Sequence, residues 1–459
     1  MVETVLIANR GEIARRVMRS CRSAGLRTVA VYSDADAELP HVGEADMAVA
    51  IGPAAARESY LRADRILDAL GQTGADAVHP GYGFLSENAD FAEAVTARGA
   101  VWIGPAPETI RDMGDKQRAR EIAQAAGVPV VPGSRRFPSG DIEGLEVAAQ
   151  EVGFPLLVKA SAGGGGIGMR RVDDRAVLHE TVEATQSMAA NAFGDGTVFL
   201  ERFIPRARHV EVQVFGFGNG EAIHLYERDC SLQRRYQKVI EETPAPDLQA
   251  DVRASMTTAA VQLARATRYE GAGTVEFIVD AETQAFFFLE MNTRIQVEHP
   301  VTEMVTGVDL VAMQIDLARG RLSDLPQDII ASSGAAIECR LYAENPAKMF
   351  MPSPGPLTCF APPEPTEALR VDTGYAEGNT VTPYYDPMIA KLIVKGDTRD
   401  AAIEAATEAL QAFRIEGLKT NRDFLLACLR HGEFAAGRVH TGFIDENGAQ
   451  LTQHVADMA

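Results

Sequence analysis

LEMNTRIQVEHP, residues 289–300, places a polar or charged side chain at every second position from Glu290 to Glu298. Successive side chains of a strand point to opposite faces, so an extended chain here would carry one polar face. A solvated surface hairpin gives the same alternation. We favour a buried site, because the preceding residues 286–289 read FFFL. The polar residues are Glu290, Asn292, Arg294, Gln296 and Glu298.

A second carboxylate interrupts the apolar strand VEFIV just upstream, at Glu276. The turn-like segment 280–285 joins the two strands, and a β-hairpin would bring Glu276 beside Glu290. Two carboxylates and the amide oxygen of Asn292 suit a hard divalent cation, and buried carboxylates without a cation or hydrogen bonds are costly. We therefore predict Glu276, Glu290 and Asn292 as metal and phosphate residues.

The distance between Glu290 and Glu298 limits the geometry of this site. A straight strand would separate them by about 26 Å, which is wider than a small-molecule reaction centre. We expect the chain to turn after Arg294, so that Arg294, Gln296 and Glu298 reach a second pocket.

Composition narrows the class of protein. The 459 residues suggest about three domains, and a hydrophobic content of 46% is ordinary for a globular protein. A net charge of −20 disfavours sequence-independent binding to nucleic acid or anionic lipid. Five cysteines without CxxC spacing predict reduced thiols; Cys230, in a charged segment, is either reactive or structural, and we favour structural. Without a signal peptide or an 18-residue apolar stretch, we expect a cytoplasmic protein with no nucleic-acid or membrane partner.

The N-terminal segment alternates strands and helices. VLIAN (5–9) and TVAVYS (28–33) are short apolar strands, and an amphipathic helix separates them at 11–25. The alternation continues to VWIG at 101–104, which predicts a parallel sheet with crossover helices. A dinucleotide site is disfavoured, because NRGEIA (9–14) lacks the GxGxxG pattern.

A glycine run follows Lys159, which ends the apolar strand PLLVKA. Four consecutive glycines (163–166) are costly to order, and their use is to let backbone N–H groups close over phosphate oxygens. No GK[ST] follows, and a kinase glycine loop precedes its lysine, so neither a Walker loop nor a kinase fits. A flexible surface loop is the alternative. Lys116 in MGDK is a second candidate phosphate cation.

These segments together resemble biotin carboxylase, the ATP-grasp enzyme of acetyl-CoA, propionyl-CoA and pyruvate carboxylases. The resemblance runs from the first strand to about Gly442. The segments that carry it are HPGYGFLSEN (79–88), MGDK (113–116), VKASAGGGG (158–166), RHVEVQV (208–214), ERDCSLQRR (227–235), MNTRIQVEHPVTE (291–303) and ECRLYAE (338–344).

The resemblance implies an α/β and α+β multidomain fold. Its parts are an N-terminal Rossmann-like (pre-ATP-grasp) domain at 1–114, an ATP-grasp domain at 115–320 and a C-terminal biotin carboxylase domain at 334–445. Residues 131–203 would form a mobile lid subdomain that carries the glycine loop, with GVPVVPGS (127–134) as its hinge.

Site residues also follow from the resemblance. The positions matching ATP contacts are Lys116, Lys159, Gly165, Gly166, Glu201, Arg202, Phe203, Ile204, His209, Gln233, Glu276 and Glu290. Glu276, Glu290 and Asn292 match ligands of two Mg²⁺ or Mn²⁺ ions. Lys238, Arg294, Val297 and Glu298 match the bicarbonate site, with Glu298 as the base. Arg340 matches the residue that receives biotin, and Tyr82 lies in the loop beside it.

The implied reaction is the first half-reaction of an acyl-CoA carboxylase. ATP and bicarbonate would give carboxyphosphate, which carboxylates biotin on a separate carrier protein, because this sequence has no AMKM-type motif. The expected partners are the biotin carboxyl carrier protein, a carboxyltransferase subunit and a second copy of the chain. Another ATP-grasp ligase with an acyl-phosphate intermediate is one alternative, and a non-catalytic ATP-binding paralogue is another.

Two positions depart from the family pattern. Ile167 stands in the glycine loop where relatives usually carry Arg or Lys, and Tyr236 stands where they usually carry His. Neither departure touches the metal, bicarbonate or biotin positions, so we assign no binding role to either residue.

Overall fold

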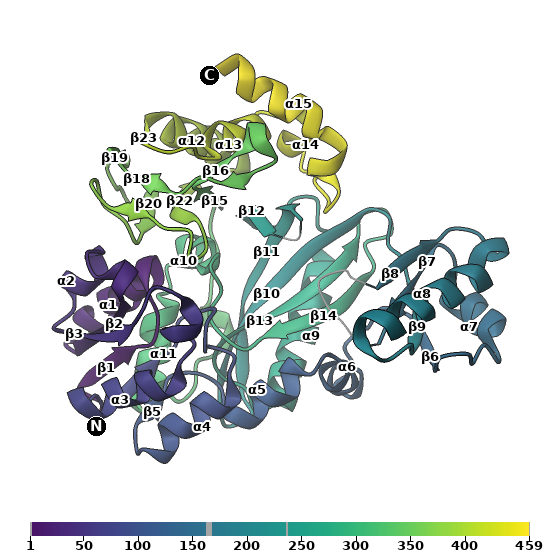
Figure 1. The fold of residues 1–459 in the computed structure, drawn as a ribbon, viewed down its shortest axis with the longest axis horizontal. Coiled ribbons are helices and arrows are strands. Elements are labelled where there is room, and N and C mark those ends of the chain that lie inside the picture. The colour runs from purple at the N-terminus through teal and green to yellow at the C-terminus, as the bar shows by residue number, and fades with distance from the viewer. Residues whose placement is uncertain (1, 162–167, 236, 459) are drawn as a thin grey trace.

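The computed structural model describes residues 2–161, 168–235 and 237–458. The predicted phosphate residues Gly165 and Gly166 and the departures Ile167 and Tyr236 therefore lie outside the described residues. Figure 1 shows a purple N-terminal part, a teal lobe on the right and a C-terminal part at the top, all arranged around one large sheet.

The N-terminal part is a five-stranded parallel sheet in the order β3-β2-β1-β4-β5. Its strands are β1 Thr4–Ile7, β2 Arg27–Ser33, β3 Met47–Gly52, β4 Ala77–His79 and β5 Val101–Trp102. Its helices are α1 Gly11–Ser23, α2 Pro40–Glu44, α3 Ala63–Thr73, α4 Ala89–Ala97 and α5 Pro107–Gly114. The predicted parallel sheet with crossover helices is confirmed. Strand β3, MAVAIG, is not among the predicted strands although its residues are apolar; it lies at the sheet edge and is partly exposed.

A small antiparallel sheet forms the lobe on the right of Figure 1. Its order is β6-β9-β7-β8, and it encloses a hydrophobic core of its own beneath two helices. Helix α6 Lys116–Ala125 precedes the lobe. The elements are β6 Gly133–Phe137, α7 Leu145–Val152, β7 Leu156–Ala160, β8 Met169–Val172, α8 Leu178–Phe193 and β9 Val198–Arg202.

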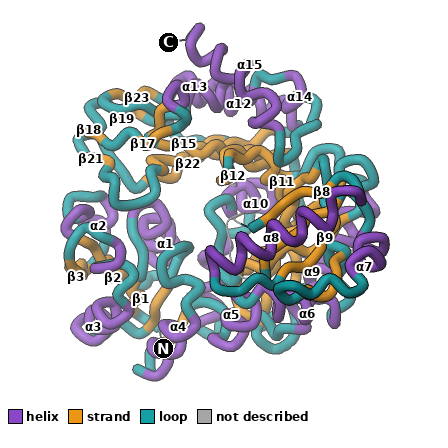
Figure 2. The backbone as a smooth tube through the Cα atoms, turned by 45° about the vertical axis from the view of Figure 1, so that its right-hand side comes forward, coloured by secondary structure: helices purple, strands orange, loops and turns teal. Residues whose placement is uncertain are grey.

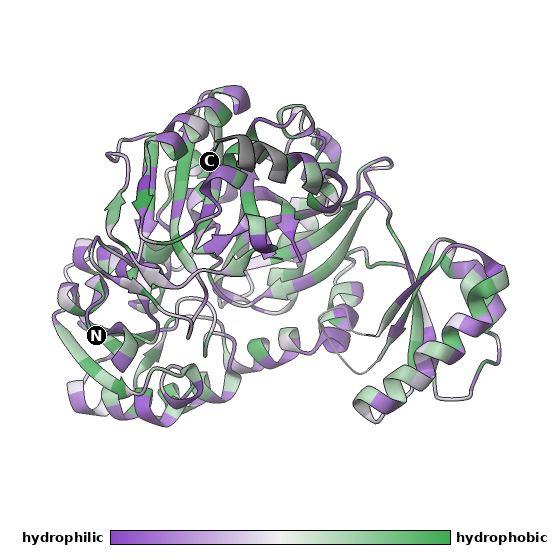
Figure 3. Cartoon of the chain, turned by 45° about the horizontal axis from the view of Figure 1, so that its top comes forward, coloured by the Kyte–Doolittle hydropathy of each residue, from purple (hydrophilic) through white to green (hydrophobic). Residues whose placement is uncertain are grey.

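The central element is an eight-stranded antiparallel sheet in the order β14-β13-β10-β11-β12-β15-β22-β20. Hydrophilic and hydrophobic stretches both occur along its strands (Figure 3). Its strands are β10 Ala207–Phe217, β11 Ala222–Arg234, β12 Gln237–Thr243, β13 Glu270–Asp280, β14 Phe286–Asn292, β15 Ala335–Tyr342, β20 Leu369–Thr373 and β22 Met388–Gly396. The pairing of β12 with β15 carries the sheet across residues 320–334, where we expect a domain boundary. The domain limits stay a prediction.

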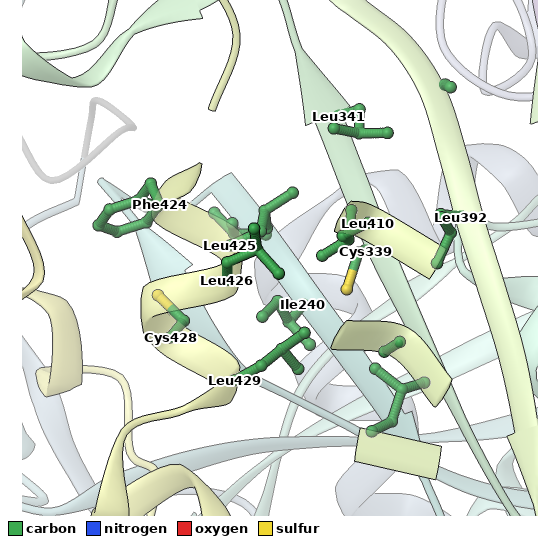
Figure 4. Close-up of a cluster of buried hydrophobic side chains, with 14 of the residues drawn as sticks. Ile240, Cys339, Leu341, Leu392, Leu410, Phe424, Leu425, Leu426, Cys428 and Leu429 are labelled. Atoms are coloured by element: carbon green, nitrogen blue, oxygen red, sulfur yellow. The ribbon is translucent and has the colours of Figure 1, made fainter. Parts of the chain in front are cut away.

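Helices cover this sheet and complete the C-terminal part (Figure 2). The C-terminal core contains Ile240, Cys339, Leu410 and Phe424, drawn in Figure 4. The helices are α9 Ala250–Ala266, α10 His299–Thr306, α11 Leu310–Ala318, α12 Arg399–Ala412, α13 Arg422–Leu429, α14 Gly432–Ala435 and α15 Phe443–Met458. Short strands are β16 Glu344–Asn345, β17 Met351–Pro352, β18 Gly355–Pro356, β19 Cys359–Ala361, β21 Thr380–Val381 and β23 Arg414–Glu416.

The five cysteines are all unpaired, and Cys230 is buried. Burial raises the pKa of the Cys230 thiol well above its ordinary value, which matches the structural alternative rather than a reactive thiol. Among the helices that the structure describes, none is both long enough and apolar enough to span a lipid bilayer.

The N-terminal part touches the C-terminal part through two glycines. A Cβ atom on Gly374 would lie 2.5 Å from the Cα atom of Gly11 and 2.7 Å from the backbone nitrogen of Glu12. Backbone atoms cannot move aside as a flexible side chain can. The contact therefore requires glycine at position 374.

We predict that Gly374→Ala lowers the free energy of unfolding by about 1–3 kcal/mol, the usual cost of overpacking a close contact. Gly71→Ala is the control, because Gly71 lies in α3 with no atom within 4 Å of an added Cβ. Urea denaturation of both variants measures the difference. Equal stabilities for the two variants would contradict a tight contact at Gly374.

Candidate active site

The hairpin of β13 and β14 pairs Glu276 with Glu290, as predicted. Strand β14 ends at Asn292, whose Nδ2 donates to Glu276 Oε1 at 2.9 Å. The chain bends at Thr293 and Arg294, and helix α10 begins at His299 with Glu298 as its N-cap. The bend that the site requires is therefore present. Only the first two polar positions, Glu290 and Asn292, belong to a strand, and the bend begins at Thr293, just before the point after Arg294 where it was expected.

The side chain of Lys238 is the centre of a buried charge cluster. Its Nζ donates to Glu211 Oε2 at 2.6 Å, to Glu298 Oε1 at 2.6 Å and to Glu276 Oε1 at 3.0 Å. Burial raises the pKa of a carboxyl group, yet Lys238 and Arg340 hold the pKa of Glu298 below its ordinary value. Glu298 is therefore ionised at neutral pH, the form that a general base requires.

Arg340 connects this cluster to strand β12. Its Nη2 lies 3.0 Å from Glu298 Oε2 and 2.5 Å from Glu241 Oε1. A purely structural pairing of Arg340 with Glu344 is excluded, since Glu344 pairs with Arg234 at 2.8 Å. The guanidinium also keeps one buried polar atom, Nε, without a hydrogen-bond partner among the described residues. A ligand can use that donor.

Arg294 and Gln296 leave the bend in different directions. Arg294 Nε donates to Glu87 Oε2 at 2.9 Å, and its Nη2 donates to Asn292 Oδ1 at 3.0 Å. Gln296 Nε2 donates to Glu276 Oε1 at 3.0 Å. Gln296 therefore binds the predicted metal carboxylate, the same oxygen that accepts from Lys238, and its expected place in the second pocket stays a prediction. Its place beside Glu276 follows from the bend, which an extended strand does not have.

A cavity of about 520 Å³ opens beside the cluster, between the N-terminal and C-terminal parts. Four residues named by the family resemblance line it: Tyr82, Arg294, Val297 and Arg340. The backbone turn from Asn9 to Ile13 also lines it. The lining further includes the aromatic side chains of Phe84, Tyr342, Tyr375, Tyr384 and Tyr385. Three guanidinium groups, of Arg10, Arg294 and Arg340, and a rim of rings suit a polar ring compound with an oxygen acceptor.

The nucleotide residues of the prediction occupy two separate sheets. Lys159 on β7 forms an ion pair of 2.7 Å with Glu201 on β9, within the small lobe. His209 on β10 lies 3.0 Å from Glu276, in the central sheet, and 3.4 Å from Gln233. The charge of Lys116, at the start of α6, is close enough to Glu290 to oppose the rise in its pKa. The two sheets therefore present cations from both sides.

The next three residues of the predicted ATP segment differ in their surroundings. Arg202 Nε donates to the carbonyl of Val152 at 2.8 Å, so this end of its guanidinium has a structural partner. Phe203 packs against the guanidinium of Arg171, 4.3 Å from its ring centre. Ile204 is buried.

The donor set of the hairpin fits a divalent cation. Burial, followed by the neighbouring carboxylate of Glu276, raises the pKa of Glu290. A positive ion between the two groups would relieve both effects. Asn292 Oδ1 is a further oxygen beside them, although it accepts from Arg294 in this conformation. Glu276, Glu290 and Asn292 would hold the ion.

Several residues of the cluster have no role in the sequence-based prediction. Glu211 binds Lys238 and, at 2.6 Å, the fully buried Arg228. Glu241 holds Arg340, and Glu87 holds Arg294. For Glu211 a signal was available: like Glu276, it is a lone carboxylate inside an apolar strand, in VEVQV (210–214). The other two pairings depend on contacts between distant segments.

Carboxylates flanked by cations on the central sheet, with Lys159 on the separate sheet of the small lobe, indicate the class, an ATP-binding enzyme of the ATP-grasp type. Family models agree: "Biotin carboxylase, N-terminal domain" matches residues 1–110, "Carbamoyl-phosphate synthase L chain, ATP binding domain" matches 115–325, and "Biotin carboxylase C-terminal domain" matches 338–446.

Relatives cover almost the whole chain. Biotin carboxylase 1 of Bacillus subtilis is 50% identical, over 97% of this chain and 98% of its own length. The rice methylcrotonoyl-CoA carboxylase subunit alpha is 52% identical, but the chain covers only 60% of that protein. The biotin carboxylase domain dimer of Hydrogenobacter thermophilus 2-oxoglutarate carboxylase, solved with MgADP, ADP and bicarbonate, has a TM-score of 0.88 at 42% identity, covering 98% of this chain and 99% of its own. The chain belongs to the biotin carboxylase family.

The buried carboxyl group of Glu241 should make the stability of the folded protein depend on pH. Burial raises its pKa from 4.5 to about 7, although Arg340 opposes the shift. Between these pH values the folded protein keeps a proton that the unfolded chain loses, so this group's stabilisation is lost as pH rises through about 7. A glutamine at this position stays neutral throughout.

We predict that the melting temperature of Glu241→Gln, minus that of the wild type, increases from pH 5 to pH 8. Thermal denaturation across this range measures the difference, with the exposed Glu416→Gln as the control. Parallel profiles for wild type and Glu241→Gln would show that Glu241 titrates normally.

Proposed function

We propose that the chain is a biotin carboxylase, an ATP-dependent ligase that uses bicarbonate to carboxylate biotin held by a separate carrier protein. The observation that carries the proposal is the contact between Glu298, Lys238 and Arg340 beside the cavity. Glu298 would be the base, Lys238 the cation that binds bicarbonate, and Arg340 the cation that binds biotin. The family membership supports the same activity.

The first step is the activation of bicarbonate. Lys238 and Arg294 orient the anion, and Glu298 takes its proton as an oxygen of bicarbonate attacks the γ-phosphorus of ATP. Bicarbonate competes with Glu298 for Lys238, so substrate binding raises the basicity of a carboxylate that is strongly stabilised without substrate. Magnesium or manganese, when bound, neutralises charge on the phosphates. ADP leaves, and carboxyphosphate remains.

The second step transfers the carboxyl group. Carboxyphosphate breaks down to carbon dioxide and phosphate, and the phosphate takes the proton of the biotin ureido nitrogen. Arg340 stabilises the enolate oxygen that forms, and the nitrogen attacks carbon dioxide. Tyr82 and Val297 form the walls of this part of the cavity. Closure of the 131–203 lobe excludes water from the labile intermediate.

ATP binding is assigned to both sheets. Lys116, Lys159 and His209 contact the phosphates, while Glu201, Arg202, Phe203, Ile204 and Gln233 hold the nucleoside. The support is the placement of most of these residues in the small lobe and in the central sheet, whose edge is the β13–β14 hairpin. For Arg202 the bond to Val152 favours a backbone contact over a side-chain contact.

The partners are proposed to be a biotin carboxyl carrier protein and a carboxyltransferase subunit. The relatives support this, since the chain covers only part of the longer carboxylase subunits. Acetyl-CoA or propionyl-CoA is the final acceptor proposed from the sequence, while the rice relative is a methylcrotonoyl-CoA carboxylase subunit. A homodimer is proposed by analogy with the Hydrogenobacter domain dimer, and the cytoplasmic location proposed from the sequence stays a prediction.

The alternatives have less support. A carbamoyl-phosphate-type ligase would share the central ATP-binding family model, but the models on either side are specific to biotin carboxylase. A non-catalytic paralogue would not need the complete set of Glu298, Lys238, Arg294 and Arg340.

ATP hydrolysis with and without bicarbonate and free biotin tests the activity. We predict that Glu298→Gln lowers bicarbonate-dependent turnover by roughly 10²–10⁴-fold, the usual contribution of a positioned base, with nucleotide affinity nearly unchanged. Glu303→Gln, in the same helix but paired with Arg16, is the control. If phosphate release by the wild type did not change when bicarbonate or free biotin was added, the proposed function would be ruled out.

Arg340→Ala is predicted to separate the two half-reactions. Biotin carboxylation should fall steeply, because the enolate loses its cation. Bicarbonate-dependent ATP hydrolysis should persist at a reduced rate, because Lys238 still holds Glu298 when Arg340 is absent. Measuring both rates on the same preparation distinguishes the outcomes. Equal loss of both would show that Arg340 serves bicarbonate as much as biotin.

A further inference from the structure

Lys391 on β22 is a fully buried lysine outside the proposed machinery. Its Nζ donates to the backbone carbonyl of Val297 at 2.8 Å. Val297 lines the cavity and directly precedes Glu298, the proposed base. Arg340 is the cross-strand neighbour of Lys391, so two cations lie side by side on one face of the sheet. Lys391 therefore ties the C-terminal part of the sheet to the loop that carries the base.

Glu12 supplies the counter-charge from the N-terminal part. Its Oε1 lies 3.1 Å from Lys391 Nζ, and the same oxygen accepts a hydrogen bond from the hydroxyl of Tyr82. Asp372, at 4.0 Å, is a second carboxylate near Lys391, but it is already paired with Arg370 at 2.6 Å. Lys391 also opposes the rise that burial causes in the pKa of Glu338, but no ion pair within 4.0 Å joins these two residues in the described part of the chain. A buried lysine without a close partner would be costly, so Glu12 is the group that stabilises it there.

The turn that carries Glu12 is the NRGEIA segment, to which the proposed function gives no role. Asn9 Nδ2 donates to the carbonyls of Pro80 at 2.8 Å and Tyr82 at 2.7 Å, so the turn also fixes the backbone of the Tyr82 loop. Burial and the charge of Glu12 raise the pKa of Tyr82 well above its ordinary value, which keeps its hydroxyl protonated as a donor. One carboxylate thus contacts both the buried lysine and the Tyr82 side chain.

We propose that Glu12 and Lys391 are positioning residues that act as one buried clamp, fixing the Val297 carbonyl and the Tyr82 hydroxyl relative to each other. The clamp holds the bicarbonate end of the cavity, at Val297 and Glu298, against the biotin end, at Tyr82. This role rests on the proposed function, because it assigns a purpose to the spacing between the two substrates. It deepens that function by naming the residues that set the spacing.

Glu12 also has an unused acceptor. Its Oε2 is buried and has no hydrogen-bond partner among the described residues, and Glu12 lines the cavity. A urea ring offers an N–H donor on each side of its carbonyl. When one ureido nitrogen of biotin faces the reacting carbon dioxide, Glu12 Oε2 is available to accept a hydrogen bond from an N–H group of the substrate in the cavity.

The test uses the full chain with Lys391→Met, Glu12→Gln and the double variant. Steady-state ATP hydrolysis and carboxylation of free biotin give KM for ATP, bicarbonate and biotin, and calorimetry gives the affinity for ADP. We expect the double variant to raise KM for bicarbonate and biotin by about 10- to 100-fold, the loss of a charged hydrogen bond. KM for ATP and the affinity for ADP should stay within about twofold, because none of the nucleotide residues that the structure describes contacts the clamp.

The double variant keeps the test valid if a single variant is destabilised. Lys391→Met leaves Glu12 buried beside no cation, so Glu12→Gln in the same chain should restore part of its lost stability and activity. Lys395→Met is the matched control: it removes a lysine from the same strand whose Nζ contacts Ser333 at 3.2 Å. Its KM values should equal those of the wild type.

The outcomes separate the clamp from the proposed function. A wild type without bicarbonate-dependent ATP hydrolysis removes the function and the clamp together. An active wild type with unchanged bicarbonate and biotin KM in the double variant removes the clamp alone. Losses that simply add from the two single variants, or a fall in melting temperature with unaltered KM values, show two independent structural residues and also overturn it.

Discussion

The structure depends on a few cations that neutralise a dense group of buried carboxylates. Lys238 donates from a single nitrogen to Glu211, Glu276 and Glu298. Each carboxylate alone would be expensive to bury, and three of them around one ammonium group are held only while every contact is kept. Arg228 and Arg340 add charge from neighbouring strands. An active centre held in this way is rigid before any substrate arrives.

This charge balance explains the single continuous sheet. Residues of the cluster come from β10, β12, β13 and β15, and the loop before α10 supplies Glu298. Antiparallel pairing of β12 with β15 joins segments that a boundary between domains would otherwise separate. Cross-strand neighbours then lie close together without any flexible connection. The β13–β14 hairpin, the proposed metal site, occupies one edge of the sheet, and Arg340 on β15, which lines the cavity, lies toward the other. The proposed phosphate chemistry and the proposed carboxylation thus share one framework.

The N-terminal part contributes the outer wall of the cavity. Its sheet holds the turn from Asn9 to Ile13 and the loop of Tyr82, and both meet the C-terminal part there. Close backbone contact between Gly11 and Gly374 is possible because Gly374 has no side chain, whereas a Cβ atom on Gly11 would lie at an ordinary 4.0 Å from Gly374. The small lobe is different, because its core is separate and Lys159 is paired within it. Such an arrangement suits a lobe that moves as one body.

Local patterns in the sequence determined much of this protein: the parallel N-terminal sheet, the hairpin that pairs Glu276 with Glu290, and the need for a bend before Glu298. The resemblance to biotin carboxylase named Lys238, Arg294 and Arg340. The hydrogen-bond partners of these side chains did not follow from local patterns. Gln296 binds Glu276 because the strand ends at Asn292, and Lys391 reaches Val297 across 94 positions of sequence. Periodicity fixes which side chains share a face of one strand, whereas strand order and the packing of a loop decide which charges meet. Only the tertiary structure supplies those distances, and at a buried site the distances determine which groups stay ionised.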